Sequence, residues 1–141
     1  MYRRLLERSS KISREKGKGV VVPPSLIKDL AKKAKSLGLE VVDEYSETKG
    51  GEVITARLYI PFEDGQNVVM IDSTYFKSEN QLAGSITLNF PAKSYFPWYE
   101  VKNLRDLERF GEEYDERGEF HRKVAQFIDY LVKKLQKEGI R

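Results

Sequence analysis

The clearest pattern in the chain is an amphipathic helix directly after a pair of prolines, Pro23 and Pro24. Its apolar positions recur three and four residues apart, which is the spacing of one helix face. They are Leu26, Ile27, Leu30, Ala31, Ala34 and Leu37, and lysines fill most of the remaining positions. Ser25 is the predicted N-cap, and Gly38 is the predicted left-handed residue that ends the helix. The spacing therefore predicts a helix over residues 26–37.

From residue 39 to residue 90 the spacing changes from helical to alternating, which is typical of strands with one buried face. The predicted strands are Leu39–Glu47, Glu52–Phe62, Asn67–Phe76 and Leu82–Phe90. Short turns separate them, and the pair Asp64-Gly65 is a strong hairpin signal. Four consecutive strands with short connections predict an antiparallel meander. A short extended piece over Trp98–Lys102 is the candidate for a fifth strand at a sheet edge.

Two helical segments close the chain. Leu104–Phe110 begins a helix that Gly111 is expected to interrupt, and the residues up to Glu119 are strongly acidic. The last predicted helix runs over 119–137 with the apolar stripe Phe120, Val124, Phe127, Ile128, Leu131 and Leu135. The sequence thus predicts a single α+β domain over residues 19–141. Its meander sheet of four strands, or five, would carry the helix after the prolines and the long C-terminal helix on one face.

Positive charge is concentrated before the sheet. The first 38 residues carry eleven Lys and Arg against three acids, whereas the remaining 103 carry fourteen against nineteen, so a net charge of +8 is followed by −5. Residues 1–18 form a basic arm whose loose apolar spacing permits a helix over 2–15. We predict that the arm binds nucleic acid, because Lys and Arg that neutralise phosphates supply most non-specific affinity. The predicted contacts are Arg3, Arg4, Arg8, Lys11, Arg14, Lys16 and Lys18.

The positive charge is also consistent with two roles that need no nucleic acid. The lysines of the helix at 26–37 are what the solvated face of any amphipathic helix carries. The acidic stretch over 106–119 offers a second partner for the arm, in its own chain or in a neighbouring one. That would make the arm a device for self-assembly or for binding another protein, so a homo-oligomer is an alternative to a nucleic-acid partner.

Composition also removes several function classes. There is no cysteine, which excludes disulfides and thiolate chemistry. The apolar runs are too short to span a membrane, and no signal-peptide hydrophobic region follows the basic N-terminus. We therefore expect a cytoplasmic protein with no membrane partner. Four Asn, four Gln and two Met beside plentiful Lys, Glu and Arg resemble the composition of thermophilic proteins.

Candidate catalytic residues are few. The one histidine, His121, stands at the start of the last helix, where an exposed surface residue is a simpler interpretation than a general base. Asp72 interrupts an apolar strand, and a strand acid with a nearby Glu-x-Lys resembles the metal site of restriction-endonuclease-like nucleases. The chain's Glu47-Thr48-Lys49 precedes Asp72 and runs into a turn, which departs from that pattern. A metal-dependent nuclease is a second alternative, but the sequence indicates no catalytic residue, metal site or cofactor.

Aromatic residues gather shortly after the fourth predicted strand. Tyr95, Phe96, Trp98 and Tyr99 lie within five residues of one another. Some of these rings are expected to close the end of the core, whereas exposed ones would stack on unpaired bases or anchor a protein interface. We take the four as a candidate aromatic contact surface.

The polar face of the predicted sheet is the last candidate surface. Arg57, Tyr59, Ser85, Thr87 and Asn89 would either be solvated or line a polar binding site. Taken with the arm, these features favour a non-enzymatic binding protein. Nucleic acid is the first choice of partner: the arm would supply affinity, and the aromatic residues would supply any preference for unpaired bases.

Overall fold

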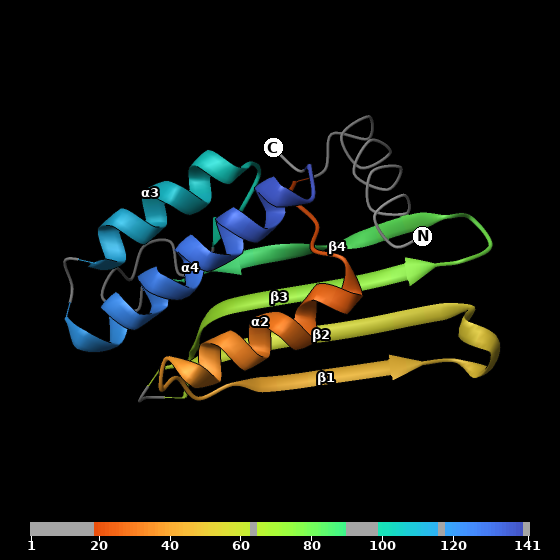
Figure 1. Ribbon diagram of the computed structural model, residues 1–141, viewed down its shortest axis with the longest axis horizontal. Coiled ribbons are helices and arrows are strands. Elements are labelled where there is room, and N and C mark those ends of the chain that lie inside the picture. The colour runs from red at the N-terminus through yellow and green to blue at the C-terminus, as the bar shows by residue number, and fades with distance from the viewer. Residues whose placement is uncertain (1–18, 63–64, 90–98, 116–117, 140–141) are drawn as a thin grey trace.

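A computed structural model describes residues 19–62, 65–89, 99–115 and 118–139 (Figure 1). The helices are α2 (Pro24–Ser36), α3 (Leu104–Asp115) and α4 (Glu119–Lys137). The strands are β1 (Val42–Glu47), β2 (Val53–Pro61), β3 (Asn67–Phe76), β4 (Gln81–Leu88) and β5 (Tyr99–Glu100), with a short 3-10 turn, Lys49–Gly51, between β1 and β2. The predictions that fall on residues 1–18 and 90–98 lie outside the described ranges.

The five strands form one antiparallel sheet in the order β1-β2-β3-β4-β5. The predicted α+β class and meander are confirmed, and so is the fifth strand at the edge. Residues opposite each other on paired strands share a face of the sheet. Leu58 of β2, Ile71 of β3 and Ile86 of β4 therefore line the same buried side, each with no exposed surface.

All three described helices lie on that buried side of the sheet, as Figure 1 shows. α4 runs between α2 and α3, and it is antiparallel to α2, since Asp29 of α2 lies beside Lys134 while Gly38 lies beside Lys123. The largest fully buried side chains come from the strands and from all three helices, which places one hydrophobic core between the two layers. The helical stripe predicted over 119–137 supplies much of it.

The start of α2 differs from the prediction. Helical structure begins at Pro24, after Pro23 as N-cap, and no side chain caps the helix, so Ser25 is not the N-cap. The reason is that proline has its φ fixed near the helical value and lacks an N–H that would need a partner in the first turn. The predicted end is confirmed, because Gly38 adopts a left-handed φ of 86°.

β1 and β4 each lose residues at one end relative to the prediction. β1 begins at Val42, since the N–H of Leu39 donates back to the carbonyl of Ala34 and the Leu39 side chain is buried below the end of α2. β4 ends at Leu88. Asn89 leaves the alternation and is only 2% exposed, which corrects its expected place on the polar face.

Gly111 does not interrupt α3, which continues to Asp115. The glycine faces α4, and a Cβ built at this position would lie 3.4 Å from the Ile128 side chain. That is an ordinary contact distance, so the helix continues because the burial of Leu107, Phe110 and Tyr114 overrides the weak helix propensity of glycine. No helix within the described part of the chain is long and apolar enough to cross a membrane.

Candidate nucleic-acid interface

The seven cations of the predicted arm, Arg3, Arg4, Arg8, Lys11, Arg14, Lys16 and Lys18, lie outside the described residues, as do Tyr95, Phe96 and Trp98. The structure does describe where the arm joins the fold. Gly19 lies against the backbone of Val101 and Lys102, and the N–H of Val20 donates to the carbonyl of Val101 at 3.3 Å. The arm therefore joins at the β5 edge of the sheet and at the beginning of α2.

Tyr99 is the one member of the aromatic group that the structure describes. It lies on β5 opposite Leu88, on the buried side of the sheet, and its ring is 4.9 Å from that of Phe110. Burial, followed by the adjacent Asp106 carboxylate, raises the pKa of its hydroxyl. Because the ring is half-buried against α3, it closes this end of the core and offers only part of its surface to a partner.

Lysines are concentrated on α2 and on the C-terminal half of α4, and we call this group the lysine surface. It consists of Lys28, Lys32, Lys33 and Lys35 of α2 with Lys133, Lys134 and Lys137 of α4. α2 carries these four lysines against one aspartate, a net charge of +3. Lys33 and Lys133 also line a groove of about 810 Å³ over α4, but Glu108, Glu112, Asp115 and Asp129 line it as well, so the groove marks the boundary of the lysine surface.

Several members of the lysine surface have internal partners. The Lys28 ammonium lies 4.1 Å from the centre of the Tyr45 ring, and Lys35 is 3.4 Å from the Asp43 carboxylate. These contacts attach α2 to β1, and exposed pairs of this kind contribute well under ~1 kcal/mol each. Lys32 and Lys137 have no ion-pair partner among the residues described, so their charge is fully available to an external anion.

A polar seam joins α2 to α4 within this surface. The carboxylate of Asp29 accepts a hydrogen bond from the Tyr130 hydroxyl at 2.7 Å and lies 3.4 Å from the Lys134 ammonium. The hydrogen bond with Asp29, then burial, raises the pKa of Tyr130, and the charge of the same carboxylate raises the pKa of Lys134. The seam fixes the spacing of the lysines on the two helices.

The acidic stretch lies on the other side of α4. α3 carries Asp106, Glu108, Glu112, Glu113 and Asp115 against Arg105 and Arg109, a net charge of −3. The buried Asp106 is structural, because its carboxylate accepts the N–H of Lys102 at 3.1 Å at the start of the helix. The division of charge along the sequence is thus also a division in space, with α2 and α3 on opposite sides of α4 (Figure 1).

The sheet face turned away from the three helices carries the other predicted polar residues. Arg57 lies 3.4 Å from the Asp72 carboxylate, which also accepts a hydrogen bond from Tyr59 at 3.0 Å. Burial and Asp72 together raise the pKa of Tyr59. The register places Glu44 and Glu100 on the same face. Its strands therefore carry Arg57 and three carboxylates, those of Asp72, Glu44 and Glu100. This face is therefore a poor match for a polyanion.

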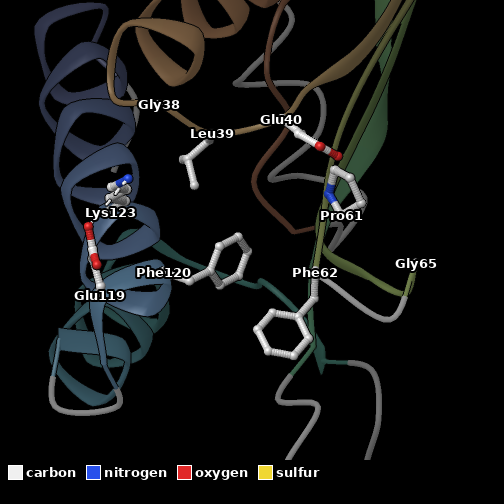
Figure 2. A pocket seen from close by; sticks show the side chains of 9 residues that line it. All are labelled: Gly38, Leu39, Glu40, Pro61, Phe62, Gly65, Glu119, Phe120 and Lys123. Atoms are coloured by element: carbon white, nitrogen blue, oxygen red, sulfur yellow. Dashed lines mark ion pairs between the residues drawn. The ribbon is translucent and has the colours of Figure 1, made fainter.

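A cleft of about 620 Å³ opens where α2 ends, β2 ends and α4 begins (Figure 2). The rings of Phe62 and Phe120 meet there with their centres 5.0 Å apart, and the charged lining consists of Glu40, Glu119 and Lys123. Lys123 lies 3.7 Å from Glu119. The cleft thus has no surplus of positive charge and does not extend the lysine surface.

His121 lies next to this cleft and is half-buried, in contrast to the exposed position expected for it. Its ring packs within about 5.5 Å of the rings of Phe62, Tyr114 and Phe120. The residue contributes to an aromatic cluster that joins β2 to the start of α4. Sequence alone did not indicate this cluster, because its members are far apart in the chain.

The residues of the nuclease pattern are not brought together. Glu47 pairs in register with Ile54 and so lies on the helix side of the sheet, whereas Asp72 pairs with Arg57 and lies on the opposite face. The partners of Asp72, the Arg57 guanidinium and the Tyr59 hydroxyl, are those of a structural carboxylate. Within the described residues, no three His, Cys, Asp or Glu side chains are grouped so that they could hold a metal ion.

Comparisons with known proteins find no family model, no curated protein and no solved structure that matches the chain. The candidate interface therefore rests on the geometry alone. Lys133, Lys134 and Lys137 were not predicted as members of this interface. The sequence does place them on the exposed side of the last helix. Their closeness to α2, however, depends on the antiparallel packing of two helices that are about a hundred residues apart in the chain.

Proposed function

We propose that the protein is a non-enzymatic nucleic-acid-binding protein in which the basic arm and the lysine surface act together. The observation that carries the proposal is the place where the arm joins the fold. The chain passes from Gly19 directly into α2 at Pro24, and α4 ends beside the first half of α2, because Lys134 contacts Asp29. The arm thus joins the fold at the end of the molecule where the lysine surface lies.

Electrostatic attraction to phosphates is the proposed source of affinity. Each phosphate that a Lys or Arg neutralises on duplex DNA changes the slope of log K against log salt concentration by about −0.9. Lys32 and Lys137, which have no ion-pair partner in the described part of the chain, are the most effective candidates on the folded domain. The polar sheet face and the cleft take no part in the proposed contact, since both carry more carboxylates than cations.

The test is binding of a labelled duplex and a labelled single strand by the full-length protein over a range of salt concentrations. We expect affinity to fall steeply with salt, and a variant with the seven arm cations replaced by alanine to lose most of it. Lys32→Ala with Lys137→Ala should lower the magnitude of the salt slope by about 1 to 2, because two phosphate contacts disappear.

A matched control removes the same charge from the far end of α4. Arg122→Ala with Lys123→Ala deletes two cations that lie next to Glu119 and Asp115, away from the beginning of α2. This variant should keep the wild-type salt slope. The proposal is wrong if the full-length protein binds neither nucleic acid at low salt, or if both double variants weaken binding equally, which would indicate a response to net charge alone.

A further inference from the structure

β1 has three features that together mark it as an interaction edge. It pairs with β2 on one side only, so along its other side its backbone N–H and C=O groups have no strand partner among the described residues. All six of its residues are exposed. Two of them, Val42 at 53% and Tyr45 at 37%, are the exposed large hydrophobic residues of the described chain.

Charge defines which kind of strand suits this edge. Asp43, Glu44 and Glu47 give β1 three carboxylates and no cation, and only Asp43 has an ion-pair partner within the described ranges, the Lys35 of α2. Acidic residues protect an edge from pairing with another acidic strand. They attract a basic one, since opposite charges on neighbouring strands are stabilising and like charges are destabilising.

Pairing of β1 with the β1 of a second copy is disfavoured by this distribution. In a two-fold antiparallel pair centred on Glu44, that residue lies opposite the same residue of the other copy. When the pair is centred on Tyr45, the Asp43 of each copy lies opposite the Glu47 of the other copy. Either register brings like charges together.

We propose that β1 is the docking edge for the basic arm, residues 1–18, of a second copy of this chain. The arm carries seven cations against Glu7 and Glu15, a net charge of +5, and so complements Glu44 and Glu47, the two β1 carboxylates that have no ion-pair partner among the described residues. The arm joins the fold beside Val101, at the β5 edge, whereas β1 is the opposite edge of the same sheet. Donor and acceptor therefore lie at different ends of the molecule, which is the arrangement of a head-to-tail, heterologous assembly.

Strand addition would supply backbone hydrogen bonds and apolar contacts in addition to the attraction between charges. An extended segment laid along β1 satisfies the open backbone groups and covers Val42 and Tyr45, in the way that peptides add to exposed sheet edges. The acidic helix α3 has charge of the right sign but no open backbone groups along its length. This difference separates the proposed acceptor from the acidic stretch over 106–119.

The experiment measures self-association of full-length protein by sedimentation equilibrium at low salt, with no nucleic acid present. We expect concentration-dependent association that weakens at least about tenfold in Glu44→Lys with Glu47→Lys, and equally in Arg14→Glu with Lys16→Glu. Mixing these two variants should restore association, because the unchanged arm of the β1 variant then meets the unchanged β1 of the arm variant. Restoration also shows that the arm variant presents a folded β1, and a circular dichroism spectrum like that of the wild type shows that the β1 variant is folded.

The matched control is Glu112→Lys with Glu113→Lys, which makes the same change of charge on α3 and should associate like the wild type. A wild type that stays monomeric at all concentrations overturns the proposal. So does a control that loses association as strongly as the β1 variant, or association that survives reversal of the arm charges, which would indicate pairing of β1 with itself. Because both measurements use the arm but only one uses nucleic acid, a failure here leaves the proposed function separately testable.

Discussion

Replacement of Tyr130 by phenylalanine should loosen the seam between α2 and α4. The substitution removes one hydroxyl and leaves the ring, over which Lys33 and Lys134 lie at 5.2 and 5.5 Å from its centre. It therefore deletes the hydrogen bond to Asp29 without opening a cavity. A hydrogen bond to a charged acceptor contributes about 1.5 to 3 kcal/mol when buried. The Asp29 side chain is 41% exposed, so water replaces part of the loss and we expect about 1 kcal/mol.

The effect should depend on pH with a defined sign. The pKa of Tyr130 is raised in the folded protein, so its contribution is fully present below the ordinary tyrosine pKa of about 10. It is lost as pH rises through the higher folded value. The free energy of unfolding of the wild type should therefore fall more steeply above about pH 10 than that of the phenylalanine variant, and the difference between the two should shrink.

The assay is urea unfolding followed by circular dichroism at about pH 7 and at several values above about pH 9, on either side of the window in which tyrosine titrates. Asp29→Asn provides a double-mutant cycle: if the hydroxyl and the carboxylate act as one interaction, the two substitutions together should cost less than the sum of their separate effects. Tyr45→Phe is the control, since that exposed ring should change stability by less than about 0.5 kcal/mol. A Tyr130 variant as stable as wild type near neutral pH, or a difference that grows with pH, would refute the reasoning.

Three further substitutions test the packing. Gly84→Ala should destabilise the fold by several kcal/mol in urea unfolding, because a Cβ there would overlap a β3 carbonyl and the residue has a φ of 149°. Gly111→Ala should instead raise the free energy of unfolding by about 0.5 to 1 kcal/mol, since alanine favours a helix and its Cβ meets Ile128 at an ordinary 3.4 Å; a loss of stability would contradict this. Asn103→Ala should cost about 1 kcal/mol in thermal unfolding, because its side chain accepts the Asp106 N–H at 3.0 Å as a helix cap, and an unchanged midpoint would show that the cap contributes nothing.

The elements that sequence predicted most accurately are those with strong local periodicity. α4 occupies 119–137 as expected, and β3 has the predicted ends, Asn67 and Phe76. In both, the apolar spacing repeats along the whole element, so a single misplaced residue does not change the pattern. The meander order also followed from local information, because short turns leave neighbouring strands little choice of partner.

The errors occurred where a distant contact overrides a local preference. Gly111 looked like a break in the helix, yet the contacts of Leu107 and Phe110 with the core keep α3 helical there. Asn89 continued the alternation in the sequence, but it turns inward, and its carbonyl accepts the Tyr114 hydroxyl from α3. These contacts join residues that are far apart in the sequence, so the pattern of neighbouring residues could not have predicted them.

The candidate surfaces were predictable only in part. A meander places its first strand at an edge, so an exposed β1 follows from the predicted order. That no described helix covers this edge depends on where α2 packs, and Lys28 and Lys35 are the α2 side chains that reach across to it. The joining of α2 lysines with those of α4 likewise requires the tertiary packing that brings Asp29 to Lys134.

The two proposals make opposite demands on the basic arm. A nucleic-acid phosphate and the β1 carboxylates compete for the same cations, so the arm of one copy cannot serve both at once. The lysine surface is different, since α2 separates its α4 lysines from β1 (Figure 1) and leaves them available in either state, whereas Lys32 lies on the α2 face whose Lys28 and Lys35 contact β1. Nucleic acid that first contacts the lysine surface would therefore lie near an arm that it can draw away from β1. Linkage requires the reverse effect of equal size, so assembly through β1 should weaken nucleic-acid binding by the same factor.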